Sequence, residues 1–98
     1  MRLHHTERLT ESITRLSAEF LARHPMSRGL VTVTGTRLDK SSRSATVFIT
    51  VYPATSETRA LAETRVLRSE LRDFLDTRLR GNSLTNIDFA LDTRGKRD

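Results

Sequence analysis

Apolar residues recur with helical spacing near the start of the chain. Over residues 6–23 one face of a cylinder collects four apolar side chains: Leu9, Ile13, Leu16 and Phe20. This pattern predicts an amphipathic helix, with Thr6 placed to cap its start. The helix should end before Pro25, because the residue preceding a proline is pushed out of the helical conformation. Residues 24–29 are then expected to form a loop.

The next two segments alternate instead, which is typical of strands. Residues 30–34 are rich in β-branched side chains, and residues 44–52 alternate over their whole length. One face of the second strand should carry Ala45, Val47, Ile49 and Val51, and the other Thr46, Phe48, Thr50 and Tyr52. The polar stretch 39–43 predicts a hairpin turn, and Gly35 predicts a bulge or tight bend.

A second helical stretch is predicted over residues 57–79, with Thr55 or Ser56 as its cap. Its clearest apolar face is formed by Leu67, Leu71 and Phe74. This face breaks near residues 63–65, so that one long helix and two helices meeting at a kink both fit the pattern.

A short strand over residues 87–92 ends the ordered pattern, after a break at Gly81 and Asn82. The basic tail 93–98 is expected to be loose. The predicted fold is a single α+β domain over residues 1–98, with its core at about 6–92. Its element order is α-β-β-α(α)-β, which indicates a three-stranded sheet with helices packed on one face.

The charge balance points to a nucleic-acid partner. The 98 residues contain 17 Lys+Arg against 12 Asp+Glu, and because Lys40 and Lys96 are the lysines, fifteen of those cations are arginines. Arginine binds phosphate through a planar fork and stacks on bases, which favours RNA or DNA binding. A GC-rich genome would also enrich arginine.

Several classes of protein are disfavoured. The chain has no cysteine, which excludes disulfides and thiolate metal sites and fits a cytoplasmic protein. No apolar run approaches the roughly 20 residues of a membrane span, so we expect no membrane partner. Acidic residues argue against an organellar transit peptide at the N-terminus: Glu7, Glu11 and Glu19.

The sequence contains no arrangement of residues that indicates catalysis. His4, His5 and His24 lack the spacing and carboxylates of a metal site. Asp88 and Asp92 have no accompanying histidine or cysteine constellation, and Ser41-Ser42 has no partner base. We therefore expect a protein that is not an enzyme, with no metal, no cofactor and no small-molecule substrate.

Two groups of cations are candidate RNA-binding residues. In the second helical stretch, Arg65, Arg68 and Arg72 share one flank, while Glu70 and Asp73 lie on the opposite flank. The alternative is a solvated face with an Arg72–Asp76 pair. The second group surrounds the hairpin turn and the start of the first strand: Arg37, Lys40, Arg43 and Arg28.

Phe48 and Tyr52 share a strand face and could stack on bases, as aromatic residues do on the open sheets of some RNA-binding domains. The pattern lacks the four-strand order of those domains, so that packing against the rest of the protein is the favoured interpretation.

The strand motifs, taken in order, resemble the bacterial ribosome-binding factor A family. The similarity spans about residues 8–92 and lies in five segments: Gly29–Gly35 (Gly-Leu-Val-Thr-Val-Thr-Gly), Arg43–Val51, Pro25–Gly29, Val66–Leu71 and Ile87–Asp92. The resemblance implies a KH-like fold and non-catalytic binding to rRNA of the small ribosomal subunit. It also implies a role in maturing that subunit and processing its rRNA, and a monomer away from the ribosome.

The chain departs from the family pattern at two places. The family has an Ala-x-Gly motif at its interhelical kink, where this chain has Glu63-Thr64-Arg65. It also has a proline before the last strand, where this chain has Leu84-Thr85-Asn86. The first departure bears on how sharply the helices bend, and an acid at Glu63 should repel phosphate.

A small protein–protein interaction module or homodimer that uses an open sheet face is the alternative. Salt distinguishes the two, because counterion release weakens RNA binding as salt rises while an apolar interface tolerates salt.

Overall fold

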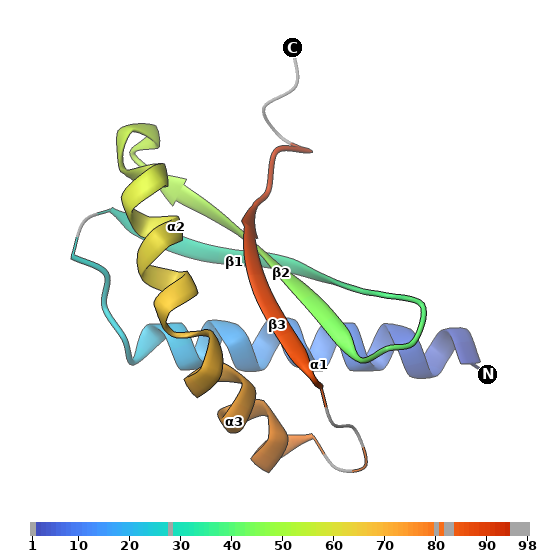
Figure 1. Cartoon of the computed structure of the whole chain (residues 1–98). Helices are drawn as coiled ribbons and strands as arrows, with labels where there is room; N and C mark the ends of the chain where they lie inside the picture. Colours follow the sequence, from blue (N-terminus) through green and yellow to red (C-terminus); the bar gives the residue numbers. More distant parts are fainter. Residues whose placement is uncertain (1, 28, 80, 82–83, 95–98) are drawn as a thin grey trace.

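The chain folds into the predicted order of helices and strands (Figure 1). The computed structural model describes residues 2–27, 29–79, 81 and 84–94, with side chains from residue 6 onward. The elements are α1 (Arg2–Ala22), β1 (Leu30–Leu38), β2 (Ser44–Tyr52), a 3-10 turn η1 (Ala54–Ser56), α2 (Glu57–Val66), α3 (Arg68–Arg78) and β3 (Asn86–Leu91). This order confirms the predicted α+β fold.

The sheet has the order β1-β2-β3, with β1 antiparallel and β3 parallel to the central β2. The pairing of β1 with β2 shifts register between Val33 and Gly35, which confirms the predicted bulge at Gly35. β1 continues past this bulge to Leu38, beyond the predicted end at Thr34, because its second half still pairs with β2. β2 has the predicted bounds.

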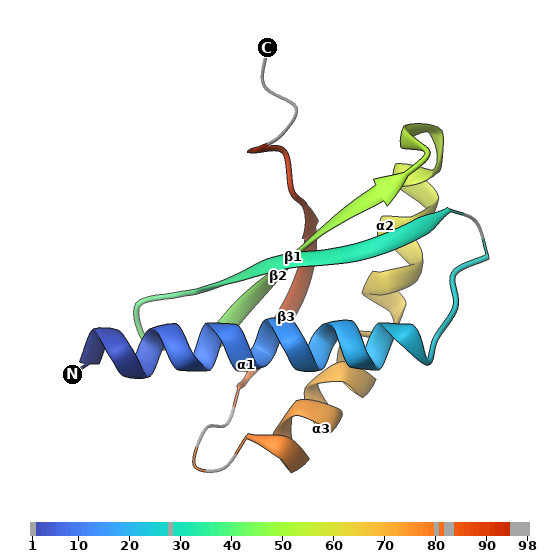
Figure 2. The same ribbon diagram turned by 180° about the vertical axis from the view of Figure 1, so that it is seen from behind.

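The core lies between one face of the sheet and the helices. β2 buries the predicted inner face, Ala45, Val47, Ile49 and Val51, and α1 buries its predicted stripe, Leu9, Ile13, Leu16 and Phe20. Seen from behind, α1 runs along the length of the sheet beside β1 (Figure 2). Removing apolar surface from water stabilises a protein by about 25 cal/mol per Å². The apolar side chains buried in this layer are therefore the main source of stability.

The start of α1 differs from the prediction. The helix begins at Arg2, so that Thr6 lies inside it and does not cap it. Residues 2–5 contain no glycine or proline to stop the helix, and the pattern of apolar residues marks only where its buried face begins. Its end at Ala22, before Pro25, agrees with the prediction.

The second helical stretch consists of two helices. The break falls at Leu67, whose N–H bonds to the carbonyl of Thr64, and not at residues 63–65. Thr64 is fully buried, and its hydroxyl donates to the Leu61 carbonyl at 2.8 Å. The buried face therefore passes through a threonine that resembled an interruption, and continues to Leu71 and Leu75; Leu67 and Phe74 are partly buried beside it. Ser56 precedes α2 but makes no side-chain cap bond.

Candidate nucleic-acid interface

Arg65, Arg68 and Arg72 lie together along the outer edge of the sheet, as helical geometry predicted. Arg65 is in the last turn of α2, Arg68 begins α3, and Arg72 follows one turn later. All three bond to β3 or to the residues around it. We call them the arginine stripe.

β3 supplies the partners that hold the arginine stripe. Arg65 donates from Nε to Asp88 Oδ1 at 3.1 Å and from Nη2 to the Phe89 carbonyl at 3.0 Å. Arg68 Nη1 lies 3.5 Å from the same Asp88 oxygen, and its Nε donates to the Arg65 carbonyl at 3.0 Å. One carboxylate thus serves two guanidinium groups and leaves the pair with a net positive charge.

Arg72 is held by the backbone in front of β3. Its Nη1 lies 3.5 Å from the Thr85 carbonyl, and the alternative ion pair with Asp76 does not form. Arg68 and Arg72 border a shallow groove of about 200 Å³ that runs from α3 to the start of β3. Since α3 begins at Arg68, the positive end of its dipole faces the same region. The groove offers an anion two guanidinium groups at its rim.

The cations of the hairpin divide between two places. Lys40 and Arg43 lie exposed in the turn, whereas Arg37 lies over the ring of Phe48 on the sheet, with Cζ 5.2 Å from the ring centroid. Asp39 organises the turn, because its Oδ1 accepts the N–H groups of Ser44 and Arg43 at 3.2 and 3.0 Å. The bond from the Ser44 backbone lowers the pKa of Asp39 most, with further help from Ser41. Arg28 lies outside the described residues.

Thr85 joins the hairpin to the arginine stripe. Its N–H and hydroxyl both donate to the Arg43 carbonyl, at 2.8 and 3.2 Å, while its own carbonyl faces Arg72. The stripe and the turn are therefore neighbours on one surface. Sequence reasoning missed Thr85 and Asp88 as the residues that position these cations, because both act through tertiary contacts.

Glu63 forms hydrogen bonds with Ser27 in the loop after α1. Its carboxylate accepts the Ser27 N–H at 3.0 Å and also the Ser27 hydroxyl, so that it ties the loop after α1 to α2. The Ser27 hydroxyl, the Ser27 N–H and the nearby Arg59 charge together lower the pKa of Glu63. The carboxylate therefore stays ionised at neutral pH, and its contacts with Ser27 fix its position on α2.

The aromatic residues of β2 lie on the open face of the sheet. Tyr52 is 76% exposed, so the prediction that it packs into the protein is wrong. Phe48 is partly exposed and contacts Arg37. In the described part of the chain the helices pack on the opposite face of β2, and no helix covers the outward aromatic positions.

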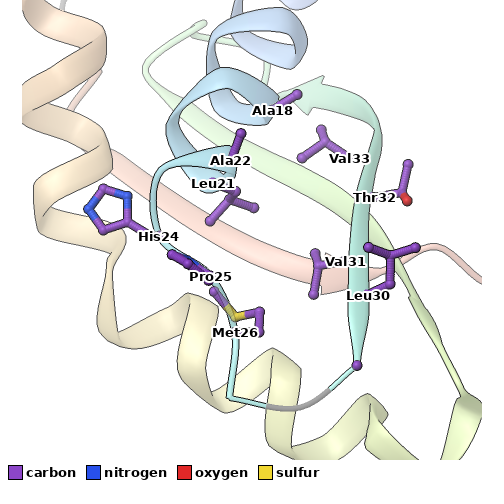
Figure 3. A pocket seen from close by; sticks show the side chains of 11 residues that line it. Ala18, Leu21, Ala22, His24, Pro25, Met26, Leu30, Val31, Thr32 and Val33 are labelled. Atoms are coloured by element: carbon purple, nitrogen blue, oxygen red, sulfur yellow. The ribbon is translucent and has the colours of Figure 1, made fainter.

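A separate apolar hollow of about 460 Å³ lies at the opposite edge of the sheet, next to β1 (Figure 3). Leu21, Met26 and Val31 line it from α1, the following loop and the strand. Among the described residues that line it there is no arginine or lysine.

Two absences hold for the part of the chain that the structure describes. No three histidine, cysteine or acidic side chains gather into a metal site among these residues. Within the same ranges, no helix is long and apolar enough to cross a membrane.

Solved structures share this architecture. The crystal structure of ribosome-binding factor A from Thermus thermophilus superimposes with a TM-score of 0.77 at 24% identity, covering 87% of this chain and 92% of that one. The chain has the fold of ribosome-binding factor A. The solution structure of a Thermotoga maritima protein provisionally assigned to ribosome-binding factor A gives a TM-score of 0.74 at 24% identity, covering 86% and 83% of the two chains. No protein-family model and no curated protein matches the sequence.

The likeness to ribosome-binding factor A confirms the fold that the strand motifs implied. It extends over nearly the whole of both chains. Two helices meet at a break here even though Glu63-Thr64-Arg65 replaces the small residues that the resemblance led us to expect.

Proposed function

We propose that this chain is a ribosome-binding protein that binds rRNA of the small subunit without catalysis and assists the maturation of that subunit and the processing of its rRNA. The fold shared with ribosome-binding factor A supports a ribosomal role. The observation that carries the RNA-binding part is that Thr85 contacts both Arg72 of the arginine stripe and the Arg43 carbonyl of the hairpin turn, which brings the two groups of cations close together. We further propose that the protein acts in the cytoplasm as a monomer.

The arrangement fits a phosphate backbone better than it fits a base. Arg68 and Arg72 border an open groove, and Lys40 and Arg43 lie beyond Thr85. Guanidinium and ammonium groups spaced along a surface position a nucleic acid through its phosphates, and they carry no sequence information by themselves. Shape would then contribute to the choice of rRNA segment.

Arg65 has a different role from its neighbours in this proposal. It makes three hydrogen bonds to β3, to Asp88 and to the Phe89 carbonyl, so that removing it would disturb the edge of the sheet. Arg68 and Arg72 are held by fewer contacts to β3 and are the better probes of RNA binding.

Co-sedimentation of the purified chain with small subunits, large subunits and whole ribosomes tests the proposal. We expect preferential pelleting with free small subunits. Arg68→Gln with Arg72→Gln should weaken it by roughly ten-fold or more, as expected for losing two charged contacts. Arg8→Gln with Arg15→Gln removes the same charge from an exposed part of α1 and should have little effect.

Absence of pelleting with any particle at low salt would remove the ribosomal role. Equal weakening by both double variants would show that net charge, and not the groove, drives the association. If the chain pellets with no particle, the interaction-module alternative would lead.

A further inference from the structure

The open face of the sheet carries a second basic site, at the other end of β3 from the groove. A hollow of about 420 Å³ lies over the β1 bulge and the centre of β2, bordered by Gly35, Arg37, Phe48 and the residues that follow β3. Figure 1 shows the chain leaving β3 on the side of the sheet away from α1. β3 has six residues at about 3.3 Å each, so this hollow and the groove are about 20 Å apart.

Asp92 and Thr34 fix Arg94 in this hollow. The Asp92 carboxylate accepts three N–H groups of Arg94, from the backbone and Nε at 3.0 Å and from Nη2 at 2.8 Å, and also accepts the Thr34 hydroxyl at 2.6 Å. The Asp92 side chain is 9% exposed and that of Arg94 is 76% exposed. The acid is thus covered and its acceptor oxygens are occupied, while the cation stays open to solvent.

Arg37 and Phe48 form a stacked pair beside it, with the guanidinium over the ring. The Arg37 guanidinium lies 5.2 Å from the centroid of the Phe48 ring, within the range of a cation–π contact. Gly35 pairs with Phe48 across the strands, and a side chain added there would come within 3.8 Å of Arg94 Nη2. Gly35 therefore lies between the strand pair and the Arg94 guanidinium, within contact distance of it.

These features fit one nucleotide of single-stranded RNA. Unpaired bases stack on aromatic rings and on arginine planes, and arginine binds phosphate through its free N–H groups. An acidic peptide could use the two cations but not the aromatic surface. We propose that this hollow is a second RNA-binding site, in which a base stacks on Phe48 and Arg37 while Arg94 binds its phosphate.

The proposal does not depend on the ribosomal role and can be tested without ribosomes. The full chain is titrated into a short oligouridine that carries one central 2-aminopurine, whose fluorescence falls when it stacks. Phe48→Leu and Arg37→Met should each weaken binding, Phe48→Leu by roughly ten-fold as base–aromatic contacts typically do. Phe48→Leu should also reduce the quenching at saturation. The same strand in a duplex should bind more weakly, because its bases are not free to stack.

The chain offers a matched control pair on α3. Arg78 lies 4.4 Å from the ring centroid of Phe74, on the helical side of the molecule. Phe74→Leu and Arg78→Met remove the same groups as the test variants and should leave oligonucleotide binding within about two-fold of the unmodified chain, which marks the absence of any stacking contribution. Circular dichroism establishes the temperature at which every variant is folded.

The second site would be overturned by no binding of the oligonucleotide at low salt, by equal losses in test and control variants, or by losses confined to Arg68→Gln with Arg72→Gln. Displacement of the oligonucleotide by polyglutamate at equal charge concentration would do the same. Quenching without co-sedimentation would remove the ribosomal role and keep this site. Co-sedimentation without quenching would do the reverse.

Discussion

Ser17 is the least satisfied polar group in the described core. Its side chain is fully buried in α1, and within the described residues its hydroxyl has no hydrogen-bond partner. Burying an unpaired hydroxyl is unfavourable, and alanine is the better helix former. We expect Ser17→Ala to raise the free energy of unfolding by about 1 kcal/mol, measured by urea denaturation. A loss of stability would show that the hydroxyl has a partner.

The residues that bond to the arginines of the site could not be predicted from the sequence. The stripe of Arg65, Arg68 and Arg72 could be predicted, because spacings of three and four residues place them on one flank of a helix, and the break at Leu67 does not separate them. Asp88 and Thr85 hold those cations only because β3 lies beside α2 and α3, and no local pattern indicates that placement. Tyr52 was misjudged for a similar reason: alternation separates two faces of a strand but does not show which residues cover the outer one.

At the scale of elements, Gly29 determines how β1 follows its loop. It has φ +80°, and a Cβ there would lie 2.9 Å from the Cβ of Ser56. Gly81 has a similar φ of +75°, and no atom of the described residues lies within 4 Å of an added Cβ, so it is a matched control. Gly81→Ala should lower the free energy of unfolding by about 1 kcal/mol, because alanine is strained in the left-handed backbone conformation. Gly29→Ala should cost at least about 2 kcal/mol more, because the new methyl group overlaps η1.

Denaturant unfolding of both glycine variants measures the difference. Equal losses of unfolding free energy in the two variants would mean that η1 can move away from the new methyl group without destabilising the protein.

Glu63 couples the loop after α1 to α2 in a way that depends on pH. Its folded-state pKa lies below the ordinary value of 4.5, because the ionised form accepts the Ser27 hydroxyl and N–H. The ionised carboxylate is therefore favoured by folding. The stabilisation it gives is complete above pH 4.5 and is lost as the pH falls through the folded-state pKa.

Glu63→Gln should consequently lower the unfolding temperature at neutral pH, and this difference from the unmodified chain should shrink at a pH well below 4.5, where the carboxylate becomes protonated. Ser27→Ala should behave alike, whereas Glu70→Gln removes a charge on an exposed part of α3 and should change little. A Glu63→Gln effect that is the same at both pH values would contradict the ionic contact.

The elements themselves were largely predictable, and the clearest miss is the break between α2 and α3. β2 matched its predicted bounds, because strict alternation over nine residues has no competing interpretation. The break in the second helical stretch was placed too early, because Thr64 counts as polar in a pattern of apolar residues. Once its hydroxyl bonds within its own helix, threonine is small and apolar enough to be buried.

At the scale of the whole molecule, the residues that stabilise the fold and the cations available for binding lie on different parts of the sheet. The helices cover one face of the sheet and form the core there. This leaves the opposite face and the β3 edge to hold cations: Arg37 and Arg94 on the face, and Arg65, Arg68 and Arg72 along the edge. In both places an acid, Asp88 or Asp92, fixes arginines without cancelling all of the local positive charge.

Salt dependence follows from this distribution of charge. Each phosphate contact releases counterions, so the slope of log affinity against log salt reports the number of contacts. For binding to small subunits we expect a steep negative slope for the unmodified chain. Arg68→Gln with Arg72→Gln should flatten it by about one to two units, because roughly 0.7 to 0.9 units are lost per phosphate contact. Arg8→Gln with Arg15→Gln should leave the slope nearly unchanged, since both side chains are on α1, away from the groove. A slope near zero for the unmodified chain would instead indicate an apolar interface, and the exposed pair of Leu30 and Tyr52 on the sheet would be the first place to look for it.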